Sequence, residues 1–553
     1  MVSTSADDDF ENVRLVVPES SSSRPSASRR ALGTSGSSSS SLAENVNHGQ
    51  MGDVNLGSAS SLEAADADAA AAASQELARS ESDFATYTVD DALNQLGFGR
   101  YQVFMLVYTG MAWTSDAMEM MLLSFIGPAV RCYWKLSPVK ESIMSAVVFL
   151  GMMVGAYVWG YVSDKYGRRT GFLATAAATF LFGLASAFAP SFAWLVLFRC
   201  FVGFGLGGVP VAFTLFLEFV PSANRGKWLV TMESFWTVGS FFESALAWAL
   251  LPTHGWRWLL AFSTLPLFML LVCFPWLPES PHYLAANGRI EEAQALLFKV
   301  AAANRKPLPP GRLVANAVKA GIADDDKTGE DSVSLSCCPP GLRVTLAGLC
   351  YLFFANAFTY YGLVLLTTEL HAATVGCDAE TRSPLLSNSD YGSILATSLA
   401  EAPGLVAAAL LIDSLGRRGS LAAGLAFASA FVFPLMFLAK GSTGAATTSV
   451  LFGARCSIMC SFTVMVIYAP EVLPTSIRST GLGLANAVAR LGGILAPFIS
   501  VSMVEAGYEK TAELLYFVVP ASGVALLMAV LKKETKGTDL GNVSTELELA
   551  EFS

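Results

Sequence analysis

The sequence predicts an all-α membrane protein with twelve transmembrane helices in two six-helix, pseudo-symmetric bundles. Three observations support this prediction: an apolar composition, a series of long apolar runs, and two charged motifs that each occur twice. Apolar residues make up 53% of the 553-residue chain and charged residues only 14%, whereas about a quarter of an ordinary soluble protein is charged. The composition therefore excludes an ordinary soluble protein.

Twelve apolar runs are long enough to cross a bilayer, because a spanning helix needs about 20 apolar residues. The first run begins about a hundred residues from the N-terminus, which distinguishes it from a cleavable signal peptide. The runs cover residues 101–123, 141–162, 171–189, 192–217, 227–251, 257–277, 343–367, 391–412, 419–439, 446–469, 481–504 and 513–531.

These runs divide the chain into five predicted segments. Residues 1–95 contain Ser-rich and Ala/Asp-rich stretches such as SSSSRPSASRR and ADADAAAAAS. Such a composition cannot bury enough apolar surface to fold, so this segment is predicted to be a disordered cytosolic tail. The other segments are an N-terminal six-helix bundle (96–277), a cytosolic linker with an amphipathic helix (278–342), a C-terminal six-helix bundle (343–533) and a cytosolic tail (534–553).

Two charged motifs occur once in each half of the chain. In the first motif an Asp precedes an Arg pair by four residues, and in the second a Glu is followed by a Pro and then an Arg. The two copies of the first motif lie 249 residues apart, and those of the second 253. This common offset indicates a duplication, which is typical of secondary transporters with a substrate site between their halves. The repeated residues are Asp164, Arg168, Glu218 and Arg225, and then Asp413, Arg417, Glu471 and Arg478.

The distribution of Lys and Arg predicts the orientation in the membrane. The short loops with the repeated motifs hold most of these residues, so these loops and both termini are predicted to be cytosolic. Arg131, Lys135 and Lys140 form an opposing cluster on the other side. Cys132 and Cys377 are predicted to share that outer side, and their spacing alone does not decide whether they form a disulfide.

Several motifs together resemble the major facilitator superfamily. They are GYVSDKYGRR after the second run, RCFVGFGLGG in the fourth, EFVPSANRG after it and PESP after the sixth. Within that superfamily, DAMEMMLLSFIGPAV and YAPEVLPTSIRSTGLG resemble the synaptic-vesicle-protein-two-like branch, which includes plant organic cation/carnitine-type carriers and plant nicotinate carriers. The resemblance covers about residues 95–535 and implies a transporter that works by alternating access.

For the repeated charges, the resemblance implies an inner gate. Ion pairs between them would hold the cytosolic side shut and break when the two halves rock. The alternative is a set of positive-inside arginines and solvated surface charges, each of which contributes little to stability. That alternative explains the arginines but not the acids beside them in both halves, so all eight repeated residues are predicted to form the gate.

Two acids lie inside the first apolar run, where a charge is costly unless it faces protein or water. Asp116 and Glu119 share one helix face, and neighbouring acids in a partly dry site do not both ionise easily. Both are therefore predicted to couple transport to protons, and the resemblance places Asp116 near a first-helix Asp of proton-coupled sugar carriers. The alternative is a structural salt bridge to Arg199 or Arg455. Arg199 stands about 28 Å from Glu218 along one helix, so it needs another partner such as a first-helix acid.

Arg490 is the only charge in the run 481–504. A lone guanidinium in that position should face a cavity, where it can hold a carboxylate. Resemblance to organic-ion carriers, in which anion carriers have Arg here, favours an anionic substrate. The alternative is a structural pair with Glu401 or Glu369. Four polar-edged residues of other runs are predicted to line the same substrate site: Asn356, Tyr360, Tyr361 and Trp236.

The prediction for function is a monomeric, proton-coupled carrier of a nicotinate-like monocarboxylate, with protons and that small molecule as its partners in a lipid bilayer. The plasma membrane is the expected location, and a vesicle or vacuolar membrane stays open. Two alternatives also stay open: a carrier of organic cations or carnitine, and a ligand-binding or sensor protein that does not transport. The sequence contains no phosphate loop, metal cluster or nucleophile–base pair. Neither an enzyme, a cofactor nor a nucleic-acid partner is therefore expected.

Overall fold

The computed structural model describes residues 86–222, 225–314, 340–372, 377, 386–438, 444–474, 477–531 and 534–535. All of them belong to one compact unit, Ser80–Ser553. This part of the chain is helical, apart from its connections and two short strands. The strands β1 (Thr86–Tyr87) and β2 (Arg312–Leu313) pair in parallel, with Thr86 opposite Arg312.

The helices of the N-terminal half coincide with the first six predicted runs. Two of these runs are broken, each next to a proline that cannot donate a backbone hydrogen bond to the preceding turn. Pro210 follows the first break and Pro266 the second. The helices are α3 (Arg100–Trp134), α4 (Pro138–Tyr166), α5 (Arg168–Ala187), α6 (Phe192–Leu206), α7 (Val209–Leu217), α8 (Arg225–Leu250), α9 (Trp256–Ser263) and α10 (Leu265–Val272).

The C-terminal half coincides with the other six runs in the same way. One run is broken at Ala400, and another continues from an α-helix into a π-helical segment, η5. The elements are α14 (Pro340–Ala372), α15 (Asn388–Leu399), α16 (Glu401–Ser414), α17 (Gly416–Val432), the 3-10 segment η4 (Phe433–Phe437), α18 (Ala445–Val472), α19 (Arg478–Pro497), η5 (Phe498–Met503) and α20 (Glu509–Ala529).

Nine helical stretches among the described residues are both long and apolar enough to cross a membrane. The pair α9–α10 forms a shorter apolar stretch, Trp256–Val272. The two other predicted runs coincide with α3 and α8, and each of these helices carries two buried acids: Asp116 and Glu119 on α3, and Glu233 and Glu243 on α8. Polar residues make these two helices less apolar than the nine. The count of twelve membrane-spanning helices therefore remains a prediction.

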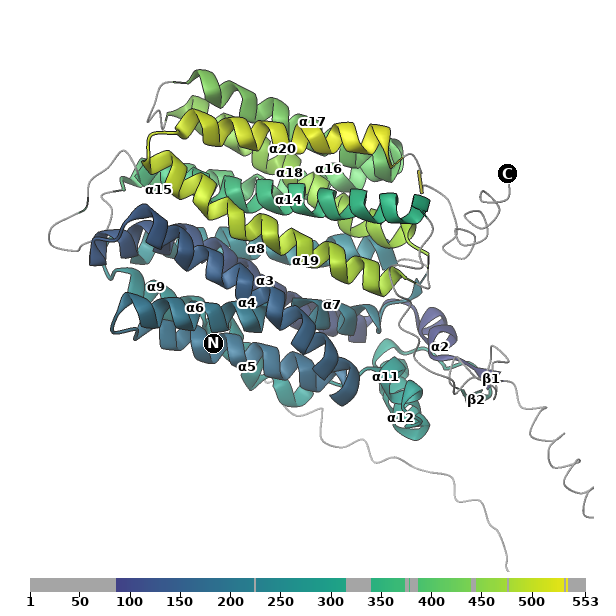
Figure 1. Ribbon diagram of the computed structural model, residues 1–553. Coiled ribbons are helices and arrows are strands. Elements are labelled where there is room, and N and C mark those ends of the chain that lie inside the picture. The colour runs from purple at the N-terminus through teal and green to yellow at the C-terminus, as the bar shows by residue number, and fades with distance from the viewer. Residues whose placement is uncertain are drawn as a thin grey trace, which may run out of the picture. The chain divides into compact units, whose positions relative to one another are not determined.

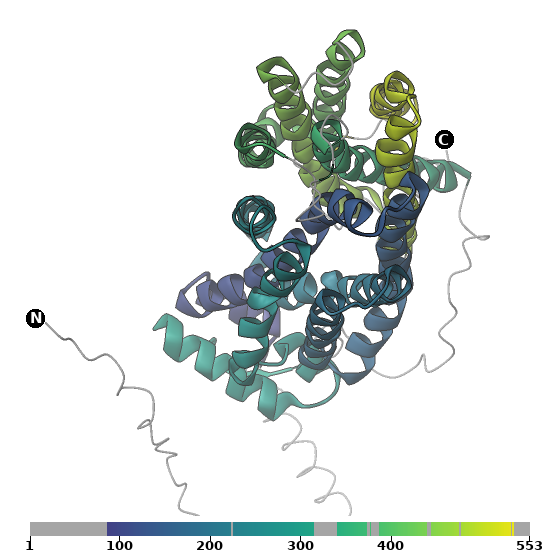
Figure 2. The same ribbon diagram turned by 90° about the vertical axis from the view of Figure 1, so that its left-hand side faces the viewer.

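The two halves lie side by side, with α14 to α20 on one side and α3 to α10 on the other (Figure 1). Within the N-terminal half α4 packs on α6, and within the other half α14 packs on α19 and α17 on α18. Across the halves, α4 contacts α19 and α8 contacts α15 and α16. The view along the helices shows both groups of helices end-on (Figure 2).

Small residues allow the close contact between α4 and α6. A Cβ atom added at Gly203 would lie 2.0 Å from the carbonyl oxygen of Val148, and one at Gly151 would lie 2.1 Å from that of Cys200. In lipid, where burial of apolar surface does not drive helix association, such backbone contacts stabilise packing. The glycine-rich motif of the fourth run therefore allows α6 to pack closely against α4 in the N-terminal half.

We call the end of the bundle that carries the repeated charged motifs the motif end, and the opposite end the disulfide end, for the Cys132–Cys377 bond there. The short helices α2 (Val89–Leu96), α11 (Pro281–Ala286) and α12 (Ile290–Asn304) gather at the motif end (Figure 1). The last of them occupies the stretch predicted as the amphipathic helix of the linker.

Residues 86–95, assigned to a disordered tail by the sequence, instead form β1 and α2. Thr88 caps α2 through its hydroxyl, which accepts from the backbone N–H of Asp91 at 3.2 Å, and the Asp91 side chain accepts from the N–H of Thr88 at 3.0 Å. Val89 and Leu93 are buried as α2 packs on α11 and α12. The T-x-x-D capping box was the signal that could have predicted this helix. The rest of the predicted tail lies outside the described residues.

Candidate functional site

A cavity of about 250 Å³ lies between the two halves. This is many times the roughly 10–15 Å³ that one water molecule needs. Its wall comes from α3, α4, α6, α7 and α8 on one side and α14, α18 and α19 on the other. The predicted site residues on it are Asp116, Trp236, Tyr360, Tyr361 and Arg490.

Three charged residues line the cavity: Asp116, Glu233 and Arg490. Asp116 and Glu233 are 9% and 6% exposed, so both carboxyl groups are nearly shielded from bulk water. Arg490 interacts electrostatically with Asp116 and with the Tyr361 hydroxyl. Glu233 was not among the predicted site residues. It is an acid in the apolar α8, and the sequence could not tell which face of that helix meets the cavity.

Both structural partners considered for Arg490 are engaged elsewhere. Glu401 pairs with Arg455 at 2.7 Å, and Glu369 pairs with Arg131 at 2.8 Å. Among the carboxylates that the structure describes, none forms an ion pair with Arg490. Its guanidinium therefore faces the cavity as a cation available to a bound molecule.

Aromatic rings form a continuous wall of the cavity across both halves. The ring centroids of Trp113 and Trp236 are 5.4 Å apart, those of Trp236 and Tyr360 6.4 Å, and those of Tyr360 and Phe462 5.9 Å. Trp236 donates its indole N–H to the Tyr360 hydroxyl at 2.6 Å, and that hydroxyl donates to Glu401 at 2.8 Å. The Tyr360 hydroxyl therefore already hydrogen-bonds to Trp236 and Glu401, and the face of the Tyr360 ring is the part available to contact a substrate.

Asn356 is not part of the cavity wall. Its side chain is fully buried, and the amide donates to the carbonyl oxygen of Leu352 at 3.0 Å. The prediction that it shares the site with Tyr360 rested on their i, i+4 spacing. Tertiary packing places Tyr360 at the cavity, whereas the Asn356 amide points toward α18, where it lies 3.5 Å from the Met465 sulfur.

Glu119 lies behind the wall and pairs with Arg199 at 2.8 Å. Both side chains are 1% exposed, and Arg199 also donates to Ser186 at 3.1 Å. Glu243, fully buried and hydrogen-bonded to Ser263, interacts electrostatically with both members of the pair. The salt-bridge alternative for Glu119 is therefore the one observed, and Asp116 is the member of the acid pair that reaches the cavity.

A second buried ion pair connects the C-terminal half to α8. Glu401 and Arg455 are both 0% exposed. Glu401 reaches α8 through Tyr360 and Trp236. Arg455 donates to Ser398 at 3.5 Å, and the Ser398 hydroxyl meets that of Ser244 on α8 at 2.8 Å. A movement of α8 relative to the C-terminal half would therefore break hydrogen bonds to this pair.

The predicted gate sets are only partly assembled. Arg168 contacts Asp164 and bonds Glu218 at 3.3 Å, and Arg417 bonds Glu471 at 3.2 Å. The other three predicted gate residues form no ion pair within the described ranges. Arg478 instead donates to the Leu473 carbonyl at 3.2 Å, Asp413 is exposed, and Arg225 begins α8. All the pairs observed stay within one half, so none of them links the halves.

A third repeated feature escaped the sequence analysis. Glu279, in the PESP motif, accepts the backbone N–H of Arg169 at 3.0 Å at the start of α5. Glu534 accepts the backbone N–H of Arg417 at 2.8 Å at the start of α17. A carboxylate at a helix N-terminus satisfies free N–H groups and interacts favourably with the helix dipole. The two glutamates are 255 residues apart, close to the offset of the other motifs, and this spacing was the missed signal.

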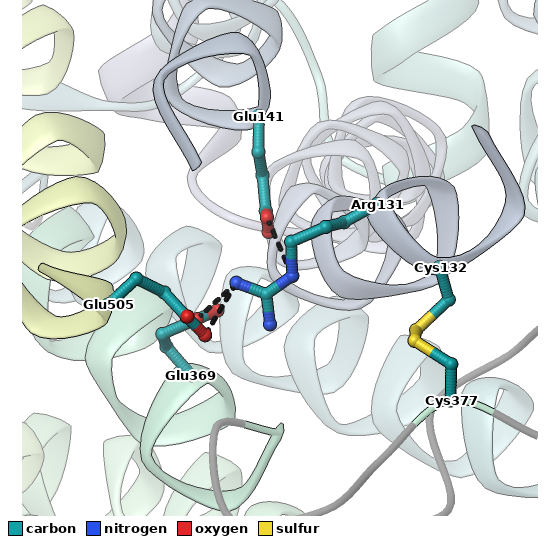
Figure 3. Close-up of a disulfide and its surroundings, with 6 residues drawn as sticks. All are labelled: Arg131, Cys132, Glu141, Glu369, Cys377 and Glu505. Atoms are coloured by element: carbon teal, nitrogen blue, oxygen red, sulfur yellow. Dashed lines mark hydrogen bonds and ion pairs between the residues drawn. A yellow bond between two sulfur atoms is a disulfide. The ribbon is translucent and has the colours of Figure 1, made fainter. Parts of the chain in front are cut away.

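At the disulfide end, four charged residues meet beside the Cys132–Cys377 disulfide (Figure 3). Arg131 lies 3.4 Å from Glu141, 2.8 Å from Glu369 and 2.7 Å from Glu505. Arg131 and Glu141 belong to the N-terminal half, and the other two acids to the C-terminal half. Both the disulfide and this cluster therefore join the halves.

The family described as sugar (and other) transporters matches residues 100–547. The chain belongs to this family, within the major facilitator superfamily. The similar structures agree: the xylose transporter XylE from E. coli, in an inward open conformation, superimposes with a TM-score of 0.62 at 17% identity, covering 81% of this chain and 100% of XylE. This transporter is thus an integral membrane protein of a family of carriers, and not an enzyme.

Two curated relatives cover most of the transporter. It is 44% identical to organic cation/carnitine transporter 7 of Arabidopsis thaliana over 485 residues, which is 82% of this chain and 96% of that protein. It is 39% identical to the synaptic vesicle 2-related protein of Bos taurus over 494 residues, or 87% and 86% of the two chains. Both agree with the branch that the motifs resemble.

Polar contacts between the halves of the transporter gather at the disulfide end and beside the cavity. Besides the Arg131 cluster, Ser142 of α4 donates to the Pro497 carbonyl at 2.9 Å. The cavity wall continues in the opposite direction, to Thr214 of α7 and Asn486 of α19, close to the motif end. The cavity is therefore closed toward the disulfide and extends toward the motif end.

Proposed function

We propose that this transporter moves a small organic monocarboxylate, such as nicotinate, together with protons by alternating access. The observation that carries the proposal is Arg490, a cavity-lining guanidinium without an ion-pair partner among the described carboxylates. Such a group binds a carboxylate in a bidentate, charge-assisted pair. The aromatic wall beside it offers ring faces to a flat substrate.

Asp116 supplies the link to protons in this proposal. When Asp116 is ionised, it neutralises Arg490 and repels an incoming anion. When Asp116 is protonated, the positive charge of Arg490 is available to the substrate. Proton and anion then bind together and cross together, as in a symporter. In this proposal Asp116 carries the proton, because Glu119, which was also predicted to do so, lies away from the cavity in its ion pair with Arg199.

The motif end is proposed to face the cytosol, with both termini on that side. The arginines of its short loops support this orientation, and so does the disulfide at the other end, because disulfides persist in oxidising compartments. The plasma membrane is the proposed location. The alternative location is a vesicle membrane, which the name of one relative, synaptic vesicle 2-related protein, supports.

A second candidate is a carrier of organic cations or carnitine. Two observations favour it: the relative named organic cation/carnitine transporter 7, and the acids Asp116 and Glu233 on a wall of aromatic rings. Carboxylates and ring faces bind a quaternary ammonium group by charge and cation–π attraction. In this candidate Asp116 is the counter-ion of the substrate and not a proton carrier.

Uptake into proteoliposomes under an imposed pH gradient tests the proposal. Labelled nicotinate and a labelled quaternary amine are offered to wild type, Arg490→Ala and Asp116→Asn. Arg289→Ala, at an exposed position just before α12, is the control. We expect Arg490→Ala to reduce nicotinate uptake at least tenfold, since truncating a close charge pair costs 1.4 kcal/mol or more.

The outcomes separate the candidates. Normal nicotinate uptake by Arg490→Ala contradicts the anion proposal. Amine uptake that needs Asp116 but not Arg490 supports the cation carrier, and a substrate that needs both residues carries both charges. No uptake of any solute, with intact ligand binding, supports a sensor that does not transport.

A further inference from the structure

The cluster at the disulfide end has more negative than positive charge. One guanidinium, that of Arg131, meets three carboxyl groups, and two of them approach the same nitrogen atom: Glu369 at 2.8 Å and Glu505 at 2.7 Å from Nη1 (Figure 3). These two carboxyl groups are therefore close neighbours. Like charges in such proximity do not both ionise easily.

Burial makes the imbalance costly. The side chains of Glu141 and Glu369 are each 2% exposed, and that of Arg131 is 16% exposed. Within the described chain, neither carboxyl oxygen of Glu141 has a hydrogen-bond partner, although the group lies 3.4 Å from Arg131. One of those oxygens, Oε1, would be 2.4 Å from a Cβ at Gly127. The Glu141 carboxyl group therefore lies against the backbone of α3, and a proton on either oxygen would displace no hydrogen bond that the described residues form.

The charged groups that face one another here come from four elements. Arg131 is on α3, Glu141 on α4, Glu369 on α14 and Glu505 just beyond η5. Arg131 interacts electrostatically with all three acids, and the acids also interact with one another. His371, two residues beyond Glu369, directs its Nδ1 to the Thr367 carbonyl at 2.8 Å. On α20, Glu513 has its own partner in Lys510 at 3.3 Å.

We propose that Glu141, Glu369 and Glu505 form a proton-binding site that takes up at least one proton from the compartment at the disulfide end before the halves close there. The inference rests on the proposed alternating access. When the halves separate at this end, the acids are hydrated and ionise freely. When they close, one Arg131 must neutralise three acids, so a proton from bulk water binds a carboxyl oxygen, and it returns to the same compartment on reopening.

The disulfide holds the two halves together permanently at this end, whereas the ion pairs of Arg131 can form and break as the halves close and open. The Cys132–Cys377 bond is covalent, so it persists whether or not the ion pairs are formed, and it limits how far the two halves can separate at this end. The charged groups, in contrast, attract only at close range.

The test measures closure directly and needs no substrate. The full-length protein, with its disulfide intact, is placed in lipid nanodiscs with two spin labels attached by non-cysteine chemistry at the exposed positions Lys140 and Ser389, one in each half. Their distance distribution is recorded from pH 5 to pH 9. We expect the short-distance population of wild type to grow as the pH falls.

The variants make the expectation specific. Glu369→Gln combined with Glu505→Gln imitates protonated acids and should stay closed at every pH. Arg131→Gln leaves three acids without a cation, so its closing midpoint should move down by at least one pH unit, a tenfold change in proton concentration. Glu292→Gln, an exposed acid on α12, should match wild type.

Three results would overturn the inference: wild type without pH response, a Gln double variant with the wild-type midpoint, or a midpoint that follows sodium concentration at constant pH. The isosteric Gln variants decide the matter even if Arg131→Gln does not fold. Failure here leaves the Arg490 proposal standing, because that proposal is measured by uptake. Normal uptake by Arg490→Ala, in turn, would not contradict the proton-binding site at the disulfide end, because that site is tested by the spin-label distances.

Discussion

Replacing Arg199 with Met isolates the energetic contribution of the buried pair with Glu119. The two side chains are 1% exposed and their charged atoms are 2.8 Å apart. After the substitution the Glu119 carboxylate stays buried without its cation, beside Glu243. Removing one partner of such a pair costs about 3–5 kcal/mol, because the remaining charge is desolvated and uncompensated.

The double variant Arg199→Met with Glu119→Leu removes the charge as well as its partner. Apolar pairs of similar volume are often as stable as the ion pair that they replace, so the double variant should recover most of the loss. Arg289→Met, which removes an exposed arginine just before α12, serves as the control and should match wild type.

Thermal unfolding in detergent, followed by the intrinsic fluorescence of the 10 tryptophans, measures these effects. For a folded unit of this size, the expected loss lowers the melting temperature of Arg199→Met by several degrees. A double variant that melts no higher than Arg199→Met would refute the reasoning, since the penalty would then come from lost packing. So would a single variant that melts with wild type.

Two other predictions test the packing and the motif end. Gly203→Ala should lower the melting temperature because its Cβ would meet the Val148 carbonyl, whereas Gly160→Ala, with nothing within 4 Å, should not; equal melting temperatures would contradict the contact. Burial lowers the pKa of His282 below its usual 6.5, against the opposing effect of Asp90 3.7 Å away. The unfolded chain then binds the proton more tightly, so stability should fall as the pH drops below about 6.5. In urea titrations from pH 7.5 to pH 5, His282→Gln should weaken this loss, and an unchanged loss would assign it to other groups.

Much of the architecture follows from properties that are local in the sequence. Apolar runs long enough to span a bilayer give the helices, since each run must satisfy its own backbone hydrogen bonds there. The common offset of the Asp/Arg and Glu/Arg motifs indicates the two halves. A lone Arg490 in an apolar run indicates a cavity, because a cation in contact with lipid would be too costly.

Charge pairing inside the bundle was not predictable in this way. Asp116 and Glu119 are equally acidic and share a helix face in the sequence, yet one lines the cavity and the other is covered by Arg199. A rotation of a few tens of degrees about the axis of α3 would exchange their environments. The i, i+4 pattern likewise treated Asn356 and Tyr360 alike, although only the tyrosine reaches the cavity.

The sequence by itself therefore determines that this protein lies in a membrane, that it is built from two related halves and that a few charges inside it must avoid lipid. Which charges meet depends on how α3, α8 and α14 rotate and pack across the interface. That choice is made by many weak contacts between segments far apart in the chain, such as the glycine contacts of α4 and α6. The same packing brings Arg131 to three glutamates and Cys132 to Cys377, and no spacing within the sequence records those meetings.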